Sequence, residues 1–356
     1  MTQGDFIRAA TPGLAFAVLL AMAAKGIYAA SGGAVSPVLC AILLGVLWRN
    51  TGGVGPWAEP GLEFAGQTLL RIGIALIGLR LTLAVLADVS LMAVPIVLSC
   101  VAVALTTAML LGRALGVPLV MRQLLAAGTA ICGCTAIIAV APLLRARKAD
   151  IGIALTCVVL FGSTAMLGYP WLAGLAFDSP RAAGMFFGAS IHDTSQVVGA
   201  SLIYAQQFNA PDTVAIAGLT KFMRTLGLLV LVPLAAMWTA RQDAARSEAP
   251  EAAGPRRGLR REVIPAFVLC FIGLVILRTA GDSLAGSWLP RWQEFLALAN
   301  ATSEWLLLCG MAAVGLGVTV SHLREAGWRP ILLSFVTALL TGLCALAWCE
   351  VYDPPI

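Results

Sequence analysis

Charged residues are scarce in this 356-residue chain: they make up 12% of it, while 60% of the residues are hydrophobic. The mean hydropathy of +0.91 is more than a soluble protein of this length can hide in a core. The composition therefore excludes a soluble domain and predicts an all-α polytopic membrane protein.

Histidine is scarcer still, with only His192 and His322. None of the nine cysteines stands at metal-ligand spacing with either histidine, so no metal site is expected, and most thiols are expected to pack as small hydrophobic groups. A nucleophile motif and a phosphate-binding loop are also missing, which argues against an enzyme. The net charge of +5 comes from loop residues and fits membrane orientation, so nucleic acid is not an expected partner.

What the chain has instead is long apolar runs. A membrane-spanning helix needs about 20 apolar residues. Nine stretches approach or reach that length, at 11–30, 35–48, 66–86, 91–112, 150–170, 212–238, 261–280, 302–320 and 330–348. Two further segments, near 122–144 and 181–203, are apolar but interrupted by small and hydroxyl residues. The sequence thus predicts about nine crossings and two broken or re-entrant helices.

The two interrupted segments resemble each other. Residues 128–139 align without a gap on residues 188–199, at an offset of 60. Freed backbone groups are tolerated within the bilayer only where they line a cavity in the protein. A matching pair of such interruptions points to the substrate site of an inverted-repeat secondary transporter.

The distribution of basic residues favours hairpins over full crossings. If all eleven segments crossed, the basic residues 145–148 and the arginine-rich stretch 241–261 would lie on opposite sides of the membrane. With both interrupted segments re-entrant, 15 loop basic residues lie inside and three outside, as the positive-inside rule requires. This threading predicts a cytoplasmic N-terminus and a periplasmic C-terminus.

A second internal match links residues 73–82 with residues 310–319, on spans that the threading runs in opposite directions. The order of repeated parts is scaffold, hairpin, hairpin, scaffold, so the halves are permuted or one hairpin is a broken crossing helix. The expected division is an extra N-terminal membrane helix (1–34), scaffold helices (35–120), a core around each interrupted segment (121–170 and 181–238), a flexible cytoplasmic linker (241–260) and further scaffold helices (261–350).

Few charges fall inside the expected spans, and most of them are positive. Lys221 and Arg224 stand three residues apart, so they share one helix face near mid-bilayer, whereas Asp193 is the one acidic residue placed firmly inside. Intramembrane ionisable groups are costly and usually functional. The positive excess predicts an anionic ligand, and pairing of the two cations with carbonyls or with Asp193 is the alternative.

Hydrogen-bond donors concentrate in the interrupted segments. In a half-helix context they are suited, with backbone N–H groups, to hold an oxyanion. The candidate substrate-binding residues are Thr129, Cys132, Thr135, Ser190, His192, Thr194, Ser195, Gln196, Lys221 and Arg224. Cys132 is included although packing is the favoured role for it.

His192 and Asp193 are also candidates for proton coupling, because a histidine near a carboxylate titrates close to neutral pH. The alternative is that Asp193 simply caps a half-helix at the hairpin tip.

The segments that carry these residues resemble a family of bacterial inner-membrane proteins, the UPF0324 or YeiH-like group, to which sulfate export has been attributed. The similarity spans roughly residues 35–350 and rests on Gly128–Gly133, Ala139–Pro142, Gly188–His192, Gln196–Val198 and Lys221–Arg224. Asp193 stands where the family pattern has Glu, and Cys134 where a smaller residue is commoner, which puts coupling and substrate in question. The resemblance implies a carrier related to the bile-acid and cation–proton carriers.

The expected function is secondary active transport of a small anion, such as sulfate or an organic sulfonate, across the bacterial inner membrane by alternating access, with export coupled to protons as one form. Sodium-coupled import of a carboxylate or bicarbonate is the first alternative, and an intramembrane enzyme the second. No cofactor is expected beyond a coupling H⁺ or Na⁺. The expected partners are the anion, the lipid bilayer and, because related folds are often dimeric, a second copy of the chain.

Overall fold

A computed structural model describes residues 3–31, 36–226, 266–284, 288–318 and 327–352, and every regular element in these ranges is helical. Seven of the helical stretches are long and apolar enough to cross a membrane, and α2 (Pro37–Thr51) is a shorter apolar helix. The protein is therefore a polytopic α-helical membrane protein. The expected linker 241–260 and the second half of the span 212–238 lie outside the described residues.

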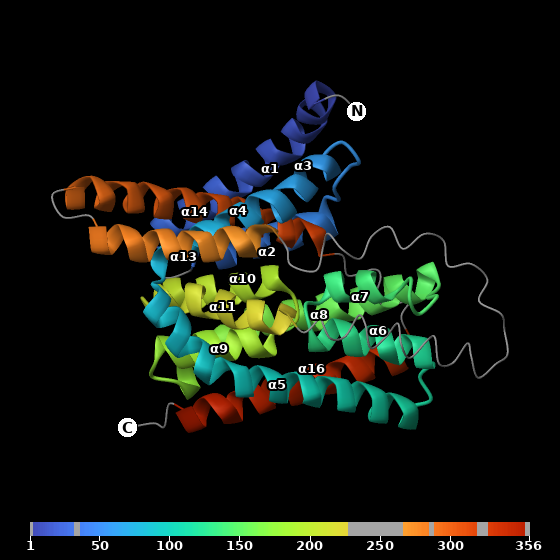
Figure 1. The fold of residues 1–356 in the computed structure, drawn as a ribbon. Helices are drawn as coiled ribbons and strands as arrows, with labels where there is room; N and C mark the ends of the chain where they lie inside the picture. The colour runs from blue at the N-terminus through green and yellow to red at the C-terminus, as the bar shows by residue number, and fades with distance from the viewer. Residues whose placement is uncertain (1–2, 32–35, 227–265, 285–287, 319–326, 353–356) are drawn as a thin grey trace.

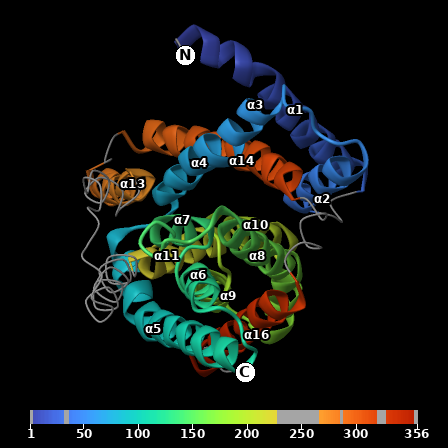
Figure 2. The same cartoon turned by 90° about the vertical axis from the view of Figure 1, so that its right-hand side faces the viewer.

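The helices form two bundles that lie side by side (Figures 1 and 2). The first, which we call the scaffold bundle, is built around α14 (Leu289–Gly317), which packs against α2 and α4 (Leu70–Ile77). Its other members are α1 (Gln3–Ala30), α3 (Glu59–Glu63), the π-helix η1 (Phe64–Leu69), the 3-10 helix η2 (Gly78–Arg80) and α13 (Ala266–Leu284).

The second bundle, the hairpin bundle, contains both interrupted segments. Two long helices, α5 (Leu83–Ala114) and α16 (Trp328–Tyr352), pack against each other on its outer side (Figure 2). The enclosed elements are α6 (Leu119–Ala130), α7 (Cys134–Val140), α8 (Lys148–Ala176), α9 (Pro180–Ser190), α10 (Thr194–Gln207) and α11 (Asp212–Leu226).

This arrangement differs from the division expected from sequence in one respect. The sequence predicts that residues 35–120 and 261–350 are all scaffold, yet α5 and α16 lie with the hairpins. The reason is packing: α5 contacts α6, α9 and α11, and α16 contacts α8 and α9, so these two helices cover the apolar faces of the broken ones.

Two span boundaries also differ. The expected spans 66–86 and 91–112 correspond to a continuous helical stretch 59–80 and to α5, which begins at Leu83. The chain becomes extended at Leu81, and the Thr82 hydroxyl accepts a hydrogen bond from the Val85 N–H, which caps α5. The apolar run continues through this break, so hydropathy alone did not reveal it.

The matched segments 73–82 and 310–319 lie on helices that pack antiparallel as far as the described residues extend. Gly73 lies against Leu307 and accepts a hydrogen bond from Ser303 Oγ (2.8 Å), whereas Gly310 lies against Leu70. The opposite directions that the sequence match predicted are therefore present in α4 and α14.

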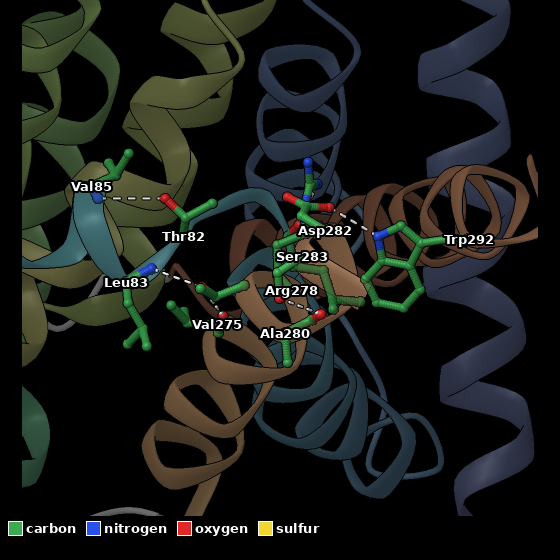
Figure 3. Close-up of polar contacts among 11 residues, drawn as sticks. Thr82, Leu83, Val85, Val275, Arg278, Ala280, Asp282, Ser283 and Trp292 are labelled. Atoms are coloured by element: carbon green, nitrogen blue, oxygen red, sulfur yellow. Dashed lines mark hydrogen bonds and ion pairs between the residues drawn. The ribbon is translucent and has the colours of Figure 1, made fainter. Parts of the chain in front are cut away.

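The two-residue break Leu81–Thr82 joins the scaffold bundle to the hairpin bundle. Residues near the end of α13 form hydrogen bonds with the chain on each side of this break (Figure 3). Arg278 Nη1 donates to the Leu79 carbonyl (3.0 Å), on the scaffold side, and the Leu83 N–H donates to Thr279 Oγ1 (2.9 Å), on the hairpin side. Arg278 is itself paired with Asp282 (2.7 Å), which also accepts from Trp292.

Candidate functional site

The two interrupted segments are hairpins with the same register. The inner arms α6 and α9 end at Ala130 and Ser190, and the outer arms α7 and α10 begin at Cys134 and Thr194. Each pair of helix ends differs by the offset of 60 that the sequence match shows. The resemblance therefore marks two structurally equivalent three-residue turns.

The first hairpin folds back at Gly133. This residue has φ +66° and ψ −124°, a conformation that glycine adopts without strain, and its N–H donates to the Gly128 carbonyl (3.0 Å). Ile137 then packs directly on Gly128, where a Cβ atom would lie 2.8 Å from Ile137 Cδ1. Nine residues of continuous helix would separate these positions by about 13 Å, so the segment turns back rather than crossing.

The second hairpin folds back at Asp193, which caps α10. Its Oδ1 accepts hydrogen bonds from the Ser195 N–H (2.9 Å) and the Ser195 hydroxyl (2.6 Å), and Gln196 completes a capping box. The rings of Phe187 and Tyr204, from opposite arms, lie 5.6 Å apart and confirm the reversal.

Both tips lie at the middle of the 29-residue helix α8. Val158 packs on Gly128 of the first hairpin, and Gln196 Nε2 of the second donates to the Val159 carbonyl (3.1 Å) and to Ser163 Oγ (3.3 Å). The hairpins enter from opposite ends of the bundle (Figure 1), so their tips meet halfway through it. At this point Gly133 and Asp193 are in contact.

Helix α11 places two basic side chains, those of Lys221 and Arg224, at the hairpin tips. It runs parallel to α9, and two glycines one turn apart on α9 allow a close approach: a Cβ atom at Gly184 would meet Ile216, and one at Gly188 would lie 2.6 Å from the Ala217 carbonyl oxygen. Small residues at i and i+4 are a common means of close helix contact within membranes. The contact places the next turn of α11 at the end of α9.

Lys221 is fully buried there and donates to three backbone carbonyls. Its Nζ lies 3.0 Å from the Ile131 oxygen and 2.9 Å from the Ile191 oxygen, and it also bonds the His192 oxygen. Ile131 and Ile191 are equivalent positions of the two turns, so the ammonium bridges the hairpins.

Arg224 repeats this bridging one turn later and is likewise fully buried. Its Nη1 donates to the Ala189 oxygen (2.5 Å) and its Nη2 to the Thr129 oxygen, which are again equivalent positions. Its Nε donates to the Ala130 oxygen (2.7 Å), and Nη1 also reaches the Ile191 oxygen (3.3 Å). The cations therefore cap the C-terminal carbonyls of both inner arms, in agreement with the carbonyl-pairing alternative for this pair.

The charges at the tips do not cancel. Two helix C-termini and two helix N-termini meet, and their partial charges of about half a unit each sum to roughly zero. The formal side-chain charges are those of Lys221, Arg224 and Asp193, which leave one positive charge. Such a charge in a low-dielectric environment attracts anions strongly.

The predicted site residues fall into two groups. One group is buried and directed into the bundle: Thr129, Cys132, Ser190, His192, Gln196, Lys221 and Arg224. The Ser190 hydroxyl, for example, donates to the Phe186 carbonyl of its own helix (2.6 Å). The other group is accessible: Thr135 is exposed, and Asp193, Thr194 and Ser195 are half-buried. These accessible residues lie at the start of the outer arms, which face the scaffold bundle (Figure 2).

The adjacent residues His192 and Asp193 have different surroundings. Asp193 is engaged as the α10 cap, as in the capping alternative. His192 is 2% exposed, and its Nδ1 has no hydrogen-bond partner among the described residues. An unpaired buried polar atom is uncommon and costs free energy.

Comparison with known proteins places this architecture in a family. The profile described as "Conserved hypothetical protein 698" matches residues 12–334, which include both hairpins and α11. The UPF0324 membrane protein RA0957 of Rhizobium meliloti is 32% identical, over 94% of this chain and 89% of the relative. The chain belongs to the UPF0324 family. It is 31% identical to the UPF0324 inner membrane protein YeiH of Escherichia coli K12, over 91% of this chain and 89% of YeiH. The UPF0324 membrane protein PA5383 of Pseudomonas aeruginosa is 33% identical, over 84% of this chain and 81% of that relative.

Several residues that build this UPF0324 site were not identified from sequence. Gly162 makes room for the Gln196 amide on α8, and Ser36 Oγ donates to Gln206 Oε1 (2.5 Å), which joins α2 to α10 across the two bundles. The i, i+4 spacing of Gly184 and Gly188 is a readable signal for the α9–α11 contact. The Ser36–Gln206 pair, 170 residues apart, gives no such signal.

Proposed function

We propose that this protein is a secondary active transporter that moves a small anion, of the sulfate or organic sulfonate type, across the bacterial inner membrane by alternating access. The observation that carries the proposal is the net positive charge at the tips of two hairpins that meet halfway through the bundle. Paired broken helices with ends at mid-membrane are the usual substrate site of such carriers.

In this proposal the anion contacts the accessible tip residues, not the two cations. The three N–H groups of Lys221 are all used by carbonyls, and the fully buried guanidinium of Arg224 donates to four carbonyls. Lys221 and Arg224 therefore act through their field, while hydroxyls such as those of Thr135 and Thr194 donate to the anion. The site opens between the hairpin bundle and the scaffold bundle, whose relative movement would expose it alternately to either side.

The basic residues support a cytoplasmic N-terminus and a periplasmic C-terminus. The described residues Arg49, Arg113, Arg145 and Arg147 lie at helix ends on the face from which the first hairpin enters, together with Arg8 and Arg329. Arg181, Arg278 and Arg291 lie toward the opposite face. By the positive-inside rule the first hairpin enters from the cytoplasm.

The sodium-coupled alternative has less support. It requires hairpin carbonyls and Asp193 to coordinate the cation, but those carbonyls accept hydrogen bonds from Lys221 and Arg224, and Asp193 caps α10. The geometry does not support the alternative of an enzyme with His192 and Asp193 as acid and base, because the Asp193 carboxylate is bonded to Ser195. We therefore infer a transporter and not an enzyme, without a cofactor.

Two further elements belong to the proposal. Proton-coupled export would use His192, whose Nδ1 is unpartnered, with Asp193 at the tip. The protein would work in the lipid bilayer as a homodimer, as related folds often do.

The test is anion-dependent thermal stabilisation of the purified protein. Sulfate, sulfite, thiosulfate, taurine, bicarbonate and citrate are compared as sodium and choline salts, with Thr135→Val and Thr194→Val in parallel. A ligand at 100 times its Kd adds about 2.7 kcal/mol to the free energy of unfolding. We expect one anion class to raise Tm, with weaker response in both variants.

Thr156→Val is the matched control, because Thr156 is a half-buried residue of α8 whose hydroxyl bonds its own helix at Gly152. It should respond like the wild type. No shift with any anion, or equal loss in the control, would remove the anion proposal.

A further inference from the structure

Three backbone carbonyl oxygens converge on one point between the hairpin tips, those of Ile131, Ile191 and His192. The first two belong to the C-cap residues that directly follow the inner arms of the two hairpins. In membrane carriers, carbonyls at the C-terminal ends of broken helices coordinate the coupling cation. Here the point is filled by Nζ of Lys221, at 3.0 Å and 2.9 Å from the isoleucine oxygens.

The number of carbonyl acceptors around Lys221 Nζ indicates whether this group is an ammonium or a neutral amine. Three carbonyl acceptors require three N–H donors, and an ammonium group has three whereas a neutral amine has two. The two distances to the isoleucine oxygens are those of N–H···O hydrogen bonds. Lys221 thus presents a monovalent cation to a carbonyl cage, with no donor left over.

We propose that the Lys221 ammonium occupies a monovalent-cation site of the hairpin tips, so the chain's own cation takes the place of a coupling ion. Because Lys221 is on α11, and α11 packs closely on α9 through Gly184 and Gly188, this cation stays with the second hairpin. A covalently attached cation cannot be exchanged with either side of the membrane. A sodium gradient therefore cannot drive transport through these carbonyls.

This consequence for coupling rests on the proposed transport function, but the cation site itself does not. The experiment therefore uses thermal unfolding of the full-length protein without any candidate substrate and with chloride held constant. Wild type and Lys221→Ala are measured in choline chloride and in increasing sodium chloride or n-propylammonium chloride. Propylammonium replaces the atoms that Lys221→Ala removes, whereas choline, with three N-methyl groups, is bulkier than those atoms and has no N–H to donate.

We expect Lys221→Ala to unfold at lower temperature than wild type in choline, and its Tm to rise saturably with sodium or propylammonium. The wild-type Tm should not distinguish sodium from choline. Lys25→Ala is the control, because Lys25 is also in a membrane helix but lies over the Trp305 ring (3.9 Å), not in a carbonyl cage. Its Tm should not recover with either cation.

Absence of any cation response in Lys221→Ala would overturn the inference. A saturable sodium stabilisation of the wild type would overturn it as well, and that measurement does not depend on the variant folding. If Lys221→Ala is recovered folded only when it is purified with sodium or propylammonium, the inference is supported; if it is recovered folded in choline and neither cation raises its Tm, the inference fails. A positive result here beside a negative anion screen would leave the cation site standing and remove the anion proposal alone.

Discussion

The two hairpins share their inner halves and differ in their outer halves. Arms α6 and α9 end in equivalent turns, are buried toward their tips and have their terminal carbonyls capped by Lys221 and Arg224. Arm α7 has seven residues and follows a glycine turn without a side-chain cap, whereas α10 has 14 residues and a capping box.

The outer arms also differ in what covers them. Residues 196–204 of α10 are buried, and α10 packs against α2 and α14 of the scaffold bundle. On α7, Thr135, Ile138 and Ala139 are exposed. In the proposed transport cycle, the inner arms would form one fixed centre, while the outer arms would set how each end of the site is closed. In this structure the second hairpin is covered and the first is open.

The strongest challenge to a shared fixed centre is Arg224→Ala. It leaves carbonyls of both hairpins buried and unpaired, so we expect a loss of at least about 3 kcal/mol in the free energy of unfolding, because each unpaired buried acceptor costs about 1–3 kcal/mol. Thermal unfolding in detergent measures it. Arg80→Ala is the comparison, because Arg80 bonds Asn300 and the 57%-exposed Glu304 and should cost about 1 kcal/mol. Equal effects would mean that the tips are not the stability centre.

Gly188→Ala probes the inner arm of the second hairpin alone. The added methyl would lie 2.5 Å from Thr220 Cβ and would push α11, with its cations, away from the tips. We expect a cost of about 1–3 kcal/mol from overpacking. At Gly218 an added Cβ meets nothing within 4 Å, so Gly218→Ala should be neutral or stabilising by up to about 1 kcal/mol. A harmless Gly188→Ala would contradict the close α9–α11 contact.

Asp193→Ala tests the difference between the turns by making the second as uncapped as the first. Loss of the bonds to Ser195 should cost about 1 kcal/mol. Asp193→Asn keeps a capping oxygen and should retain most of the stability. The pair also separates roles in a transport assay: a coupling carboxylate fails in both variants, whereas a cap fails only in the alanine variant.

Gln206→Ala addresses the cover over the second hairpin and should have the smallest effect. It removes the bond from Ser36 Oγ and the weaker one from the Val38 N–H (3.4 Å), together about 0.5–1.5 kcal/mol. Hydrogen exchange at the N-terminus of α2 should increase, while exchange in α6 stays unchanged. Gln207→Ala, at the neighbouring exposed position, is the control.

The hairpins could be predicted from the sequence because their signal is local. The offset-60 match predicts both turns, and the basic loops predict that the two hairpins enter from opposite ends. The roles of Lys221 and Arg224 could not be decided, since their partners are backbone carbonyls 29 to 95 residues away, which any residue provides. The hydrogen bond of the Ser190 hydroxyl to its own helix could not be predicted for a related reason: a serine within a helix bonds its own backbone when no other acceptor is nearer.

The break at Leu81–Thr82 acts as a tether whose length limits how the bundles can part. Only two non-helical residues separate Arg80, at the end of η2, from Leu83, at the start of α5. Even fully extended, that stretch of chain spans roughly 10 Å. Beside it, Arg278 and Thr279 of α13 form hydrogen bonds with the last turn before the break and with the start of α5, so both helix ends are attached to the same helix. Any large displacement between the bundles must therefore swing about this corner, with little travel at the end of the molecule where the corner lies and most of it at the opposite end.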